Sequence, residues 1–334
     1  MFFLGIHPLA NAQVPVPEPV KSAMPGSGKP NVIIILSDDQ GVGDFSCHGN
    51  PVLKTPALDK LYNESVHFGN FHVAPLCTPS RSQLMTGLDA MRNGAATVLT
   101  GRNLMHRELI TMPEVFRNNG YATGIFGKWH LGDIFPDRPM DRGFEKCIWH
   151  KGWGLLSETE FDNDYYETRY LDSLETRQSG EYCTNLWFNK AMEWMDETAG
   201  KNQPFFTYLA LNAPHRPFDS PAQDYLYYRN QVKDSLTACF LGMIRNIDRN
   251  MARLDRWLED SGLKDNTLLV YMNDNGGTGG TELYNAGLRD KKGSVYEGGH
   301  RAACFVRWPE GNLSGSGTIS TPAQIQDLFP TFIE

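Results

Sequence analysis

Four short runs of hydrophobic residues divide the chain and predict buried strands. The first run, NVIIILS, covers residues 31–37, and similar runs cover residues 121–127, 204–212 and 266–274. Apolar and polar positions do not alternate in the first run, and most of its residues are β-branched. Continuous apolar runs of this length are typical of strands that are buried on both faces of a mainly parallel sheet.

Segments with helical spacing lie between these runs. Residues 55–65 and 111–120 each begin with a Thr that can cap a helix. The longest helical pattern extends from Leu236 to Leu258, with apolar residues three or four positions apart, and Gly262 ends it. Alternating strands and helices predict an α/β fold, in which a large mixed, mainly parallel sheet is sandwiched by helices.

Polar residues follow each hydrophobic run at its carboxyl end. In open α/β sheets the ligand site lies beyond the carboxyl ends of the strands, so these residues can converge on one cleft. Taken singly, each cluster is more often a turn, a helix cap or an ordinary loop residue than part of a ligand site. The occurrence of all four clusters after strands favours a common ligand-binding site. The clusters are Asp38 with Asp39, Lys128 with His130, His215 in the sequence APHRP, and Asp274 with Asn275.

Two of these clusters predict a metal site. Asp38, Asp39, Asp274 and Asn275 offer oxygen donors only, and three of them are carboxylates. Such a set suits a hard divalent cation and not zinc. Adjacent carboxylates repel each other unless a cation lies between them. Ligand type alone does not separate calcium from magnesium.

A thiol lies at the start of a predicted helix in the sequence CTPSRSQLMTG. Free N–H groups and the positive end of the helix dipole make this position favourable for an anion. Arg81 lies one helical turn after Cys77, on the same face. Cysteine phosphatases combine the same residue types with C-x5-R spacing, whereas the spacing here is C-x3-R. Lys291 and Lys292 belong to a Gly-rich loop that reads as solvated surface unless it folds over the cleft.

Composition limits the classes of partner. The 334 residues carry a net charge of −8 at pH 7, without a run of Lys or Arg, so no nucleic acid is expected to bind. The six cysteines include no C-x-x-C pair, which argues against a zinc ribbon or a thioredoxin-type site. After the first residues no apolar stretch reaches the roughly 18 residues of a membrane span.

The N-terminal residues predict export. Residues 1–12 are mainly apolar and end in A-N-A, a small-x-small pattern that fits a remnant of a signal peptide. Residues 13–30, rich in Pro, Gly and Ser, fit a flexible lead-in to a folded domain over residues 31–334. A periplasmic or secreted protein is expected. Residues 321–334 begin another amphipathic helix, which suggests a fragment of a longer protein.

Six sequence blocks together resemble the type I sulfatases of the alkaline-phosphatase superfamily. CTPSRSQLMTG resembles their signature, and SDDQG, GKWHLG, APHRP, NDNGG and KKGSVYEGGHR resemble their other blocks. The likeness extends from Asn31 to the end of the chain. It implies an alkaline-phosphatase-like sulfatase fold with a truncated C-terminal subdomain. It also implies hydrolysis of sulfate monoesters, in sulfated carbohydrates or aryl sulfates.

The resemblance also implies roles for single residues. Cys77 is expected to become 3-oxoalanine (formylglycine), made by a formylglycine-generating maturation enzyme, and its hydrate is expected to be the nucleophile. One calcium ion would be held by Asp38, Asp39, Asp274 and Asn275 together with the modified Cys77. Arg81 would position these groups, and His130 would orient the hydrate. Lys128, His150, His215 and Lys292 would bind sulfate, with His215 as general acid.

Two other functions remain open from the sequence. A phosphate or phosphonate monoester hydrolase of the same superfamily can share the whole set of residues. A non-catalytic protein that binds anions or glycans would keep Cys77 as a thiol, although the complete set of acid, nucleophile and metal groups argues against it. Four aromatic residues could form a sugar-stacking wall or belong to the core: Trp149, Trp153, Tyr165 and Tyr166.

Overall fold

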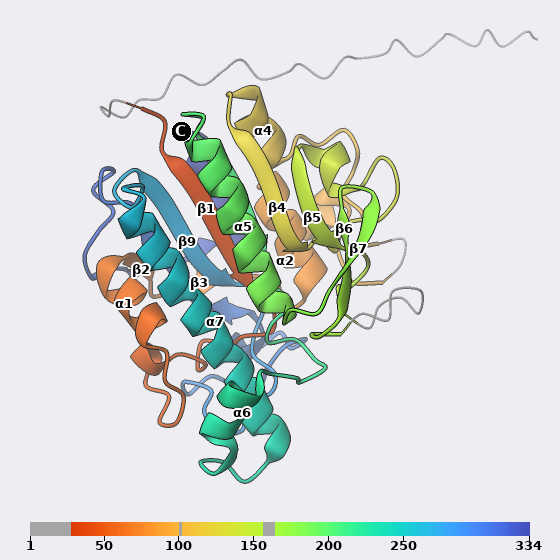
Figure 1. Cartoon of the computed structure of the whole chain (residues 1–334). Coiled ribbons are helices and arrows are strands. Elements are labelled where there is room, and N and C mark those ends of the chain that lie inside the picture. Colours follow the sequence, from red (N-terminus) through yellow and green to blue (C-terminus); the bar gives the residue numbers. More distant parts are fainter. Residues whose placement is uncertain (1–27, 100–101, 156–163) are drawn as a thin grey trace, which may run out of the picture.

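The computed structural model describes residues 28–99, 102–155 and 164–334 (Figure 1). The expected signal-peptide remnant, residues 1–12, and nearly all of the expected lead-in, residues 13–30, lie outside the described residues. Within the described ranges, no helix is both long enough and apolar enough to cross a membrane.

The strands and helices alternate along the chain as the hydrophobic pattern predicts. The strands are β1 (Asn31–Ser37), β2 (Val66–Phe68), β3 (Phe71–His72), β4 (Ala122–Lys128), β5 (Lys146–His150), β6 (Thr168–Asp172), β7 (Glu175–Ser179), β8 (Phe205–Ala210), β9 (Thr267–Asn273), β10 (Arg301–Ala302), β11 (Cys304–Arg307), β12 (Gly317–Ile319) and β13 (Ala323–Gln324). The α-helices are α1 (Pro56–Glu64), α2 (Cys77–Thr86), α3 (Ala90–Asn93), α4 (Met112–Asn118), α5 (Cys183–Ala199), α6 (Ala222–Arg229), α7 (Ser235–Asp260), α8 (Glu297–His300) and α9 (Leu328–Ile333). Short 3-10 helices cover Ser46–His48, Pro139–Arg142 and Ile325–Asp327.

A large mixed sheet forms the centre of the molecule. Its strand order is β12-β2-β11-β9-β1-β8-β4-β5-β6-β7 within the described residues. The neighbours from β9 to β5 are all parallel, and β1 has Ile34 opposite both Val270 of β9 and Tyr208 of β8. The flanking pairs β2–β11, β11–β9, β5–β6 and β6–β7 are antiparallel, while the edge pair β12–β2 is parallel. The prediction of a large mixed, mainly parallel sheet is confirmed.

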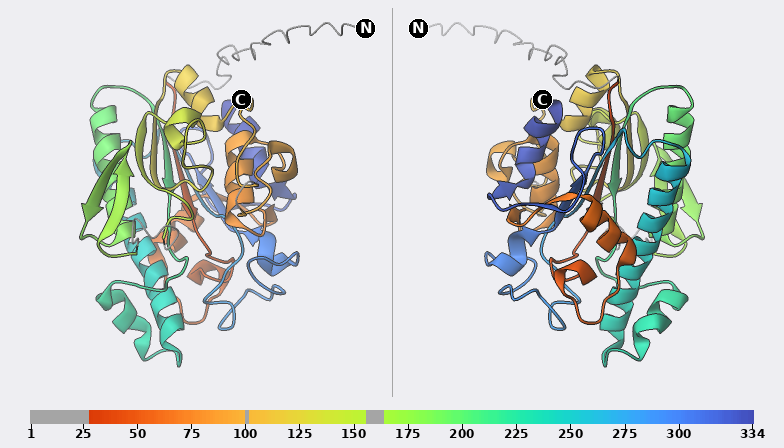
Figure 2. Two further views of the ribbon diagram at one scale, coloured as in Figure 1. Left: turned by 90° about the vertical axis from the view of Figure 1, so that its right-hand side faces the viewer. Right: turned by 90° about the vertical axis from the view of Figure 1, so that its left-hand side faces the viewer.

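Helices cover both faces of the sheet, as predicted. On one face, Ile33 and Ile35 of β1 pack in one cluster with Leu186 of α5 and Met243 of α7. On the other face, alternate residues of β1 such as Ile34 pack with residues of α2, α4 and α9. Figure 2 shows the sheet between these two helical layers. Because β1 is buried on both sides, its five central residues, 32–36, are all apolar.

The end of the chain also follows the predicted pattern. Residues 321–334 contain the strand β13, a 3-10 helix and α9, so the expected amphipathic helix is present over a shorter range. Ile325 and Leu328 pack in the same cluster as Leu84 of α2. The last described residues therefore cover one face of the helix that begins at Cys77.

A second, small sheet lies beside the start of α2. It contains β10, β3 and β13, and Arg301 of β10 pairs with His72 of β3. Val73 donates its backbone N–H to the carbonyl oxygen of His300 at 2.9 Å. This sheet therefore fixes the segment that precedes Cys77 against the segment that follows the loop containing Lys292.

Candidate active site

Residues that follow three strands of the sheet meet at its carboxyl edge. β1 and β9 are parallel neighbours with Ser37 opposite Asn273, so Asp38 and Asp274 leave the sheet side by side. The backbone N–H of Asp38 donates to the carbonyl of Ala213 after β8, and that of Asp274 donates to Ser37, each at 3.1 Å. The parallel register therefore brings distant polar residues together.

Four side chains at this edge could hold one metal ion. Asp38, Asp39, Cys77 and Asp274 are buried, and each offers a ligand atom within 4.8 Å of the others. Asn275 donates through Nδ2 to Asp39 Oδ1 at 3.0 Å, while its own Oδ1 is buried without a hydrogen-bond partner among the described residues. Buried polar atoms are nearly always paired. An unpaired amide oxygen beside three buried carboxylates fits a hard cation such as calcium.

Two cations lie directly against these carboxylates. Arg81 NH2 is 3.1 Å from Asp274 Oδ2 and 3.5 Å from Asp38 Oδ2, and Arg81 NH1 donates to the carbonyl of Lys128 at 2.8 Å. Lys128 Nζ contacts Asp38 Oδ2 at 2.5 Å, and the side chains of Lys128 and Arg81 are fully buried. The anionic cluster therefore lies in a pocket that also carries fixed positive charge.

Burial and close charges shift the pKa values of two of these carboxyl groups in opposite directions. Burial raises the pKa of Asp38, but Lys128, His215 and Arg81 outweigh it and hold the pKa well below its ordinary value. Burial and the charge of Asp38 raise the pKa of Asp274 to about 7. Like charges this close resist ionising together. A divalent cation between them would remove this conflict.

Cys77 is the first residue of α2 and is almost completely buried. Its Sγ lies 3.3 Å from Asp38 Oδ1 and 3.3 Å from Lys292 Nζ. Burial and then Asp38 raise the pKa of the thiol, so it is protonated at neutral pH. A protonated thiol is a poor nucleophile. Pro79 lies in the first turn of the helix, where its missing N–H costs little.

The loop with the two lysines lies against the carboxylate cluster, and its two lysine side chains differ in exposure. Lys292 Nζ bonds Asp39 Oδ1, and its side chain is 18% exposed. Lys291 is exposed. The loop closes tightly, because a Cβ at Gly298 would lie 1.9 Å from the carbonyl oxygen of Asp290. The surface-loop interpretation therefore holds for Lys291 and is wrong for Lys292.

Two histidines frame the carboxylate cluster. His130, directly after β4, has a φ of 61° and is buried, and neither ring nitrogen has a hydrogen-bond partner among the described residues. Burial and Lys128 hold its pKa well below the ordinary value. His215 Nδ1 lies 2.7 Å from the carbonyl of Arg216, so Nδ1 carries the proton. This leaves His215 Nε2 facing the cluster, 3.8 Å from Asp39 Oδ2.

His150 lies one strand away from this group. It ends β5 opposite Lys128 and is buried. Its Nε2 is 3.0 Å from Thr168 Oγ1, and its ring packs edge-on to Trp187 with centroids 4.8 Å apart. In the part of the chain that the structure describes, no hydrogen bond or ion pair joins His150 to the carboxylate cluster.

The aromatic residues near the site divide into core and surface. Trp149 and Tyr165 are fully buried, whereas the side chain of Trp153 is 55% exposed. The sequence leaves Tyr165 open between a sugar-stacking wall and the core, and the structure places it in the core. Its hydroxyl lies 2.9 Å from the carbonyl of Asn212 and 2.7 Å from that of His215, so it fixes the loop that carries His215. An aromatic residue in a sequence gives no signal for such a long-range backbone contact.

Comparisons with known proteins agree on one family. The family model for sulfatases matches residues 30–334. Arylsulfatase J of Mus musculus is 31% identical over 333 residues, which cover 95% of this chain and 54% of the relative. N-acetylgalactosamine-6-sulfatase of Mus musculus is 29% identical over 334 residues, which cover 90% of this chain and 61% of the relative. The chain thus spans between about half and three fifths of these relatives.

A solved structure shares the fold at a similar level of identity. The crystal structure of Ps i-CgsB in complex with k-i-k-neocarrahexaose superposes with a TM-score of 0.82 at 29% identity. The match covers 91% of this chain and 71% of that protein. The large sheet and its two helical layers are therefore shared with a protein that binds an oligosaccharide.

Proposed function

The chain belongs to the sulfatase family, and we propose that it hydrolyses sulfate monoesters. One observation carries the proposal. At the carboxyl edge of the sheet, three buried carboxylates lie together with Cys77 at a helix start and with fixed cations. An amide oxygen beside them has no hydrogen-bond partner in the described parts of the chain. Such a pocket offers both a cation site and positive charge for a tetrahedral anion.

A sulfated carbohydrate is the substrate class we propose. The structure of Ps i-CgsB holds k-i-k-neocarrahexaose, and two similar curated relatives are named as sulfatases. Trp153 offers an exposed indole for stacking on a sugar. The next residue, Gly154, approaches the site, since a Cβ there would lie 3.4 Å from Lys128 Cδ.

Calcium and formylglycine are the groups we propose for this site. Asp38, Asp39, Asp274 and Asn275 would hold the ion together with the group at position 77. A bound calcium ion supplies Lewis-acid polarisation of the sulfate. Formylglycine at position 77 supplies a hydrated aldehyde as nucleophile, and a maturation enzyme that recognises the CTPSR segment would make it.

The residues around position 77 would then have distinct tasks. Lys128 and Lys292 would bind sulfate oxygens, because both ammonium groups lie against the carboxylate cluster and Lys292 also reaches Cys77. His215 would protonate the leaving alcohol from Nε2 after that nitrogen has taken up a proton from solvent, because Nδ1–H stays on a backbone carbonyl and the side chain is partly exposed. His130 would accept a proton from the group at position 77 through a free ring nitrogen. Arg81 would hold the carboxylates and the helix start in place.

Two further parts of the proposal concern His150 and location. His150 would support sulfate binding through its place beside Lys128 in the sheet. The apolar N-terminal residues favour a periplasmic or secreted protein.

Rates on matched substrates test the proposal. The full chain is produced together with a formylglycine-generating enzyme, and kcat/KM is measured for an aryl sulfate and for the corresponding aryl phosphonate, with and without calcium. We expect faster hydrolysis of the sulfate and loss of activity after calcium is chelated. A strong preference for the phosphonate would instead assign the chain to phosphonate hydrolysis, the alternative within the same superfamily.

A further inference from the structure

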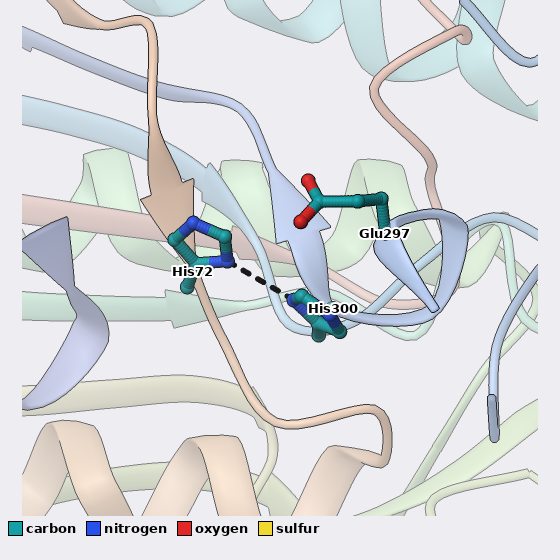
Figure 3. A group of neighbouring side chains, drawn as sticks. All are labelled: His72, Glu297 and His300. Carbon is teal, nitrogen blue, oxygen red and sulfur yellow. Dashed lines mark hydrogen bonds between the residues drawn. The ribbon is translucent and has the colours of Figure 1, made fainter. Parts of the chain in front are cut away.

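A second group of metal-ligand side chains lies on the small sheet beside the cleft. His72 belongs to β3, and Glu297 and His300 begin and end α8. Each of the three offers a ligand atom within 4.8 Å of the others. Figure 3 shows both imidazoles and the carboxylate facing one small volume. None of these residues belongs to the carboxylate cluster of the proposed active site.

The neighbours of His72 leave one of its ring nitrogens free to bind a metal. Asn70 Oδ1 accepts a hydrogen bond from Arg301 NH1, which fixes this atom as the amide oxygen. His72 Nε2 lies 2.8 Å from the same Oδ1 and therefore carries the proton. His72 Nδ1 then has a lone pair, and it points at His300 Nδ1 at 3.0 Å. Metal-binding histidines commonly donate their other N–H to an oxygen in this way.

The distances are close to those around one transition-metal ion. Zinc binds imidazole nitrogen at about 2.0–2.1 Å, so two such ligands in a tetrahedral site are roughly 3.3 Å apart. The His72–His300 distance of 3.0 Å needs only a small rotation of either ring. The side chain of Glu297 is 47% exposed and pairs with Arg301 at 3.1 Å. It can turn toward the imidazoles at the cost of one partly exposed ion pair.

The chemistry of this set differs from that of the carboxylate cluster. Two imidazoles and one carboxylate suit zinc and similar transition ions, whereas calcium takes oxygen ligands. A simple hydrogen bond between the two rings would explain the 3.0 Å contact. It would not use the carboxylate of Glu297, which is the third member of the set.

We propose that His72, Glu297 and His300 form a second metal site, which binds a divalent transition ion such as zinc. The ion would link β3, which leads directly to Cys77, with α8, which follows the loop of Lys292. The two segments already touch, because Gly293 N–H donates to the carbonyl of Pro75 at 2.9 Å. A bound ion would stabilise the junction that keeps Lys292 Nζ 3.3 Å from Cys77 Sγ.

Zinc binding by the full chain tests this site. The protein is stripped with a chelator and kept in excess calcium, which occupies the oxygen-rich cluster. Zinc is then titrated by calorimetry, and the melting temperature is followed. We expect one zinc ion per chain and, at about 100 times the Kd, a rise of roughly 5 °C in Tm.

Single substitutions separate this site from other zinc binding. His300→Ala and His72→Ala should abolish the bound zinc and the Tm shift, whereas the exposed His106→Ala should retain both. Glu297→Gln changes only an exposed side chain, so it keeps the test valid if a histidine variant fails to fold. It should weaken zinc binding about tenfold or more and leave the zinc-free Tm unchanged. Unchanged zinc affinity in both Glu297→Gln and His300→Ala, or no zinc bound by the unmodified chain, would overturn the proposal. Neither result would bear on sulfate hydrolysis.

Discussion

Replacing Lys292 with Ala should reduce turnover strongly, while replacing its neighbour Lys291 should not. Lys292 Nζ lies 3.3 Å from Cys77 Sγ, the position where the sulfate would be attacked. Two unit charges at this distance interact by about 5 kcal/mol at an effective dielectric constant of ~20. Because solvent and neighbouring groups recover part of this energy, we expect a loss of ~10²–10³-fold in kcat. The kcat of the Lys291→Ala variant should remain within about twofold of that of the unmodified protein, because the Lys291 side chain is exposed.

The assay is kcat and KM on an aryl sulfate for Lys292→Ala and Lys291→Ala, at saturating calcium. Calcium affinity is measured on the same samples, because Lys292 also neutralises Asp39. Removing that positive charge should leave calcium binding as tight or tighter, so a loss of metal cannot explain lower turnover. A kcat for Lys292→Ala within threefold of that of the unmodified protein would refute this reasoning. An equal decrease in kcat for Lys292→Ala and Lys291→Ala would refute it as well.

Two further predictions concern proton transfer and stability. His215→Asn should slow sulfate esters of poor leaving groups, such as sugar alcohols, by ~10²-fold or more, and activated aryl sulfates much less; equal losses on both would exclude His215 as general acid. Asp248 of α7 accepts hydrogen bonds from Ala57 and Leu58 through Oδ1, and burial raises its pKa from 3.8 to about 7. Since the folded state retains a proton that the unfolded state releases, stability should fall between pH 5 and pH 7 by roughly 2–3 kcal/mol from this group. Asp248→Asn keeps Oδ1 and should remove that part of the pH dependence in urea unfolding; an unchanged dependence would contradict the assignment.

The sheet and the carboxylate cluster could be predicted because local pattern and topology agree. Residues 32–36 of β1 are all apolar, as expected for a strand with both faces covered, and that pattern is visible in the sequence. Once the strands are parallel, the polar residues after β1, β8 and β9 must leave the sheet at the same edge. The proximity of Asp38 and Asp274 can therefore be predicted from the sequence, because each follows an apolar run that forms a parallel strand.

Other features depend on contacts that the sequence does not encode locally. β7 is polar and largely exposed, so it carries no hydrophobic pattern that would predict a strand. Only the resemblance separates Lys292 from Lys291, because the contact of Lys292 with Asp39 joins residues 253 positions apart and leaves no local pattern in the sequence. His72 and His300 are 228 positions apart and lie at the ends of very short elements. Periodicity could not pair them.

The chemical state of residue 77 decides the central claim most directly. Peptide mass spectrometry across the CTPSR segment is carried out on active protein made in a host that contains a formylglycine-generating enzyme. We predict the mass of 3-oxoalanine at position 77, in a fraction of chains that rises in proportion to specific activity. Active protein in which position 77 is only unmodified cysteine would contradict the proposed mechanism.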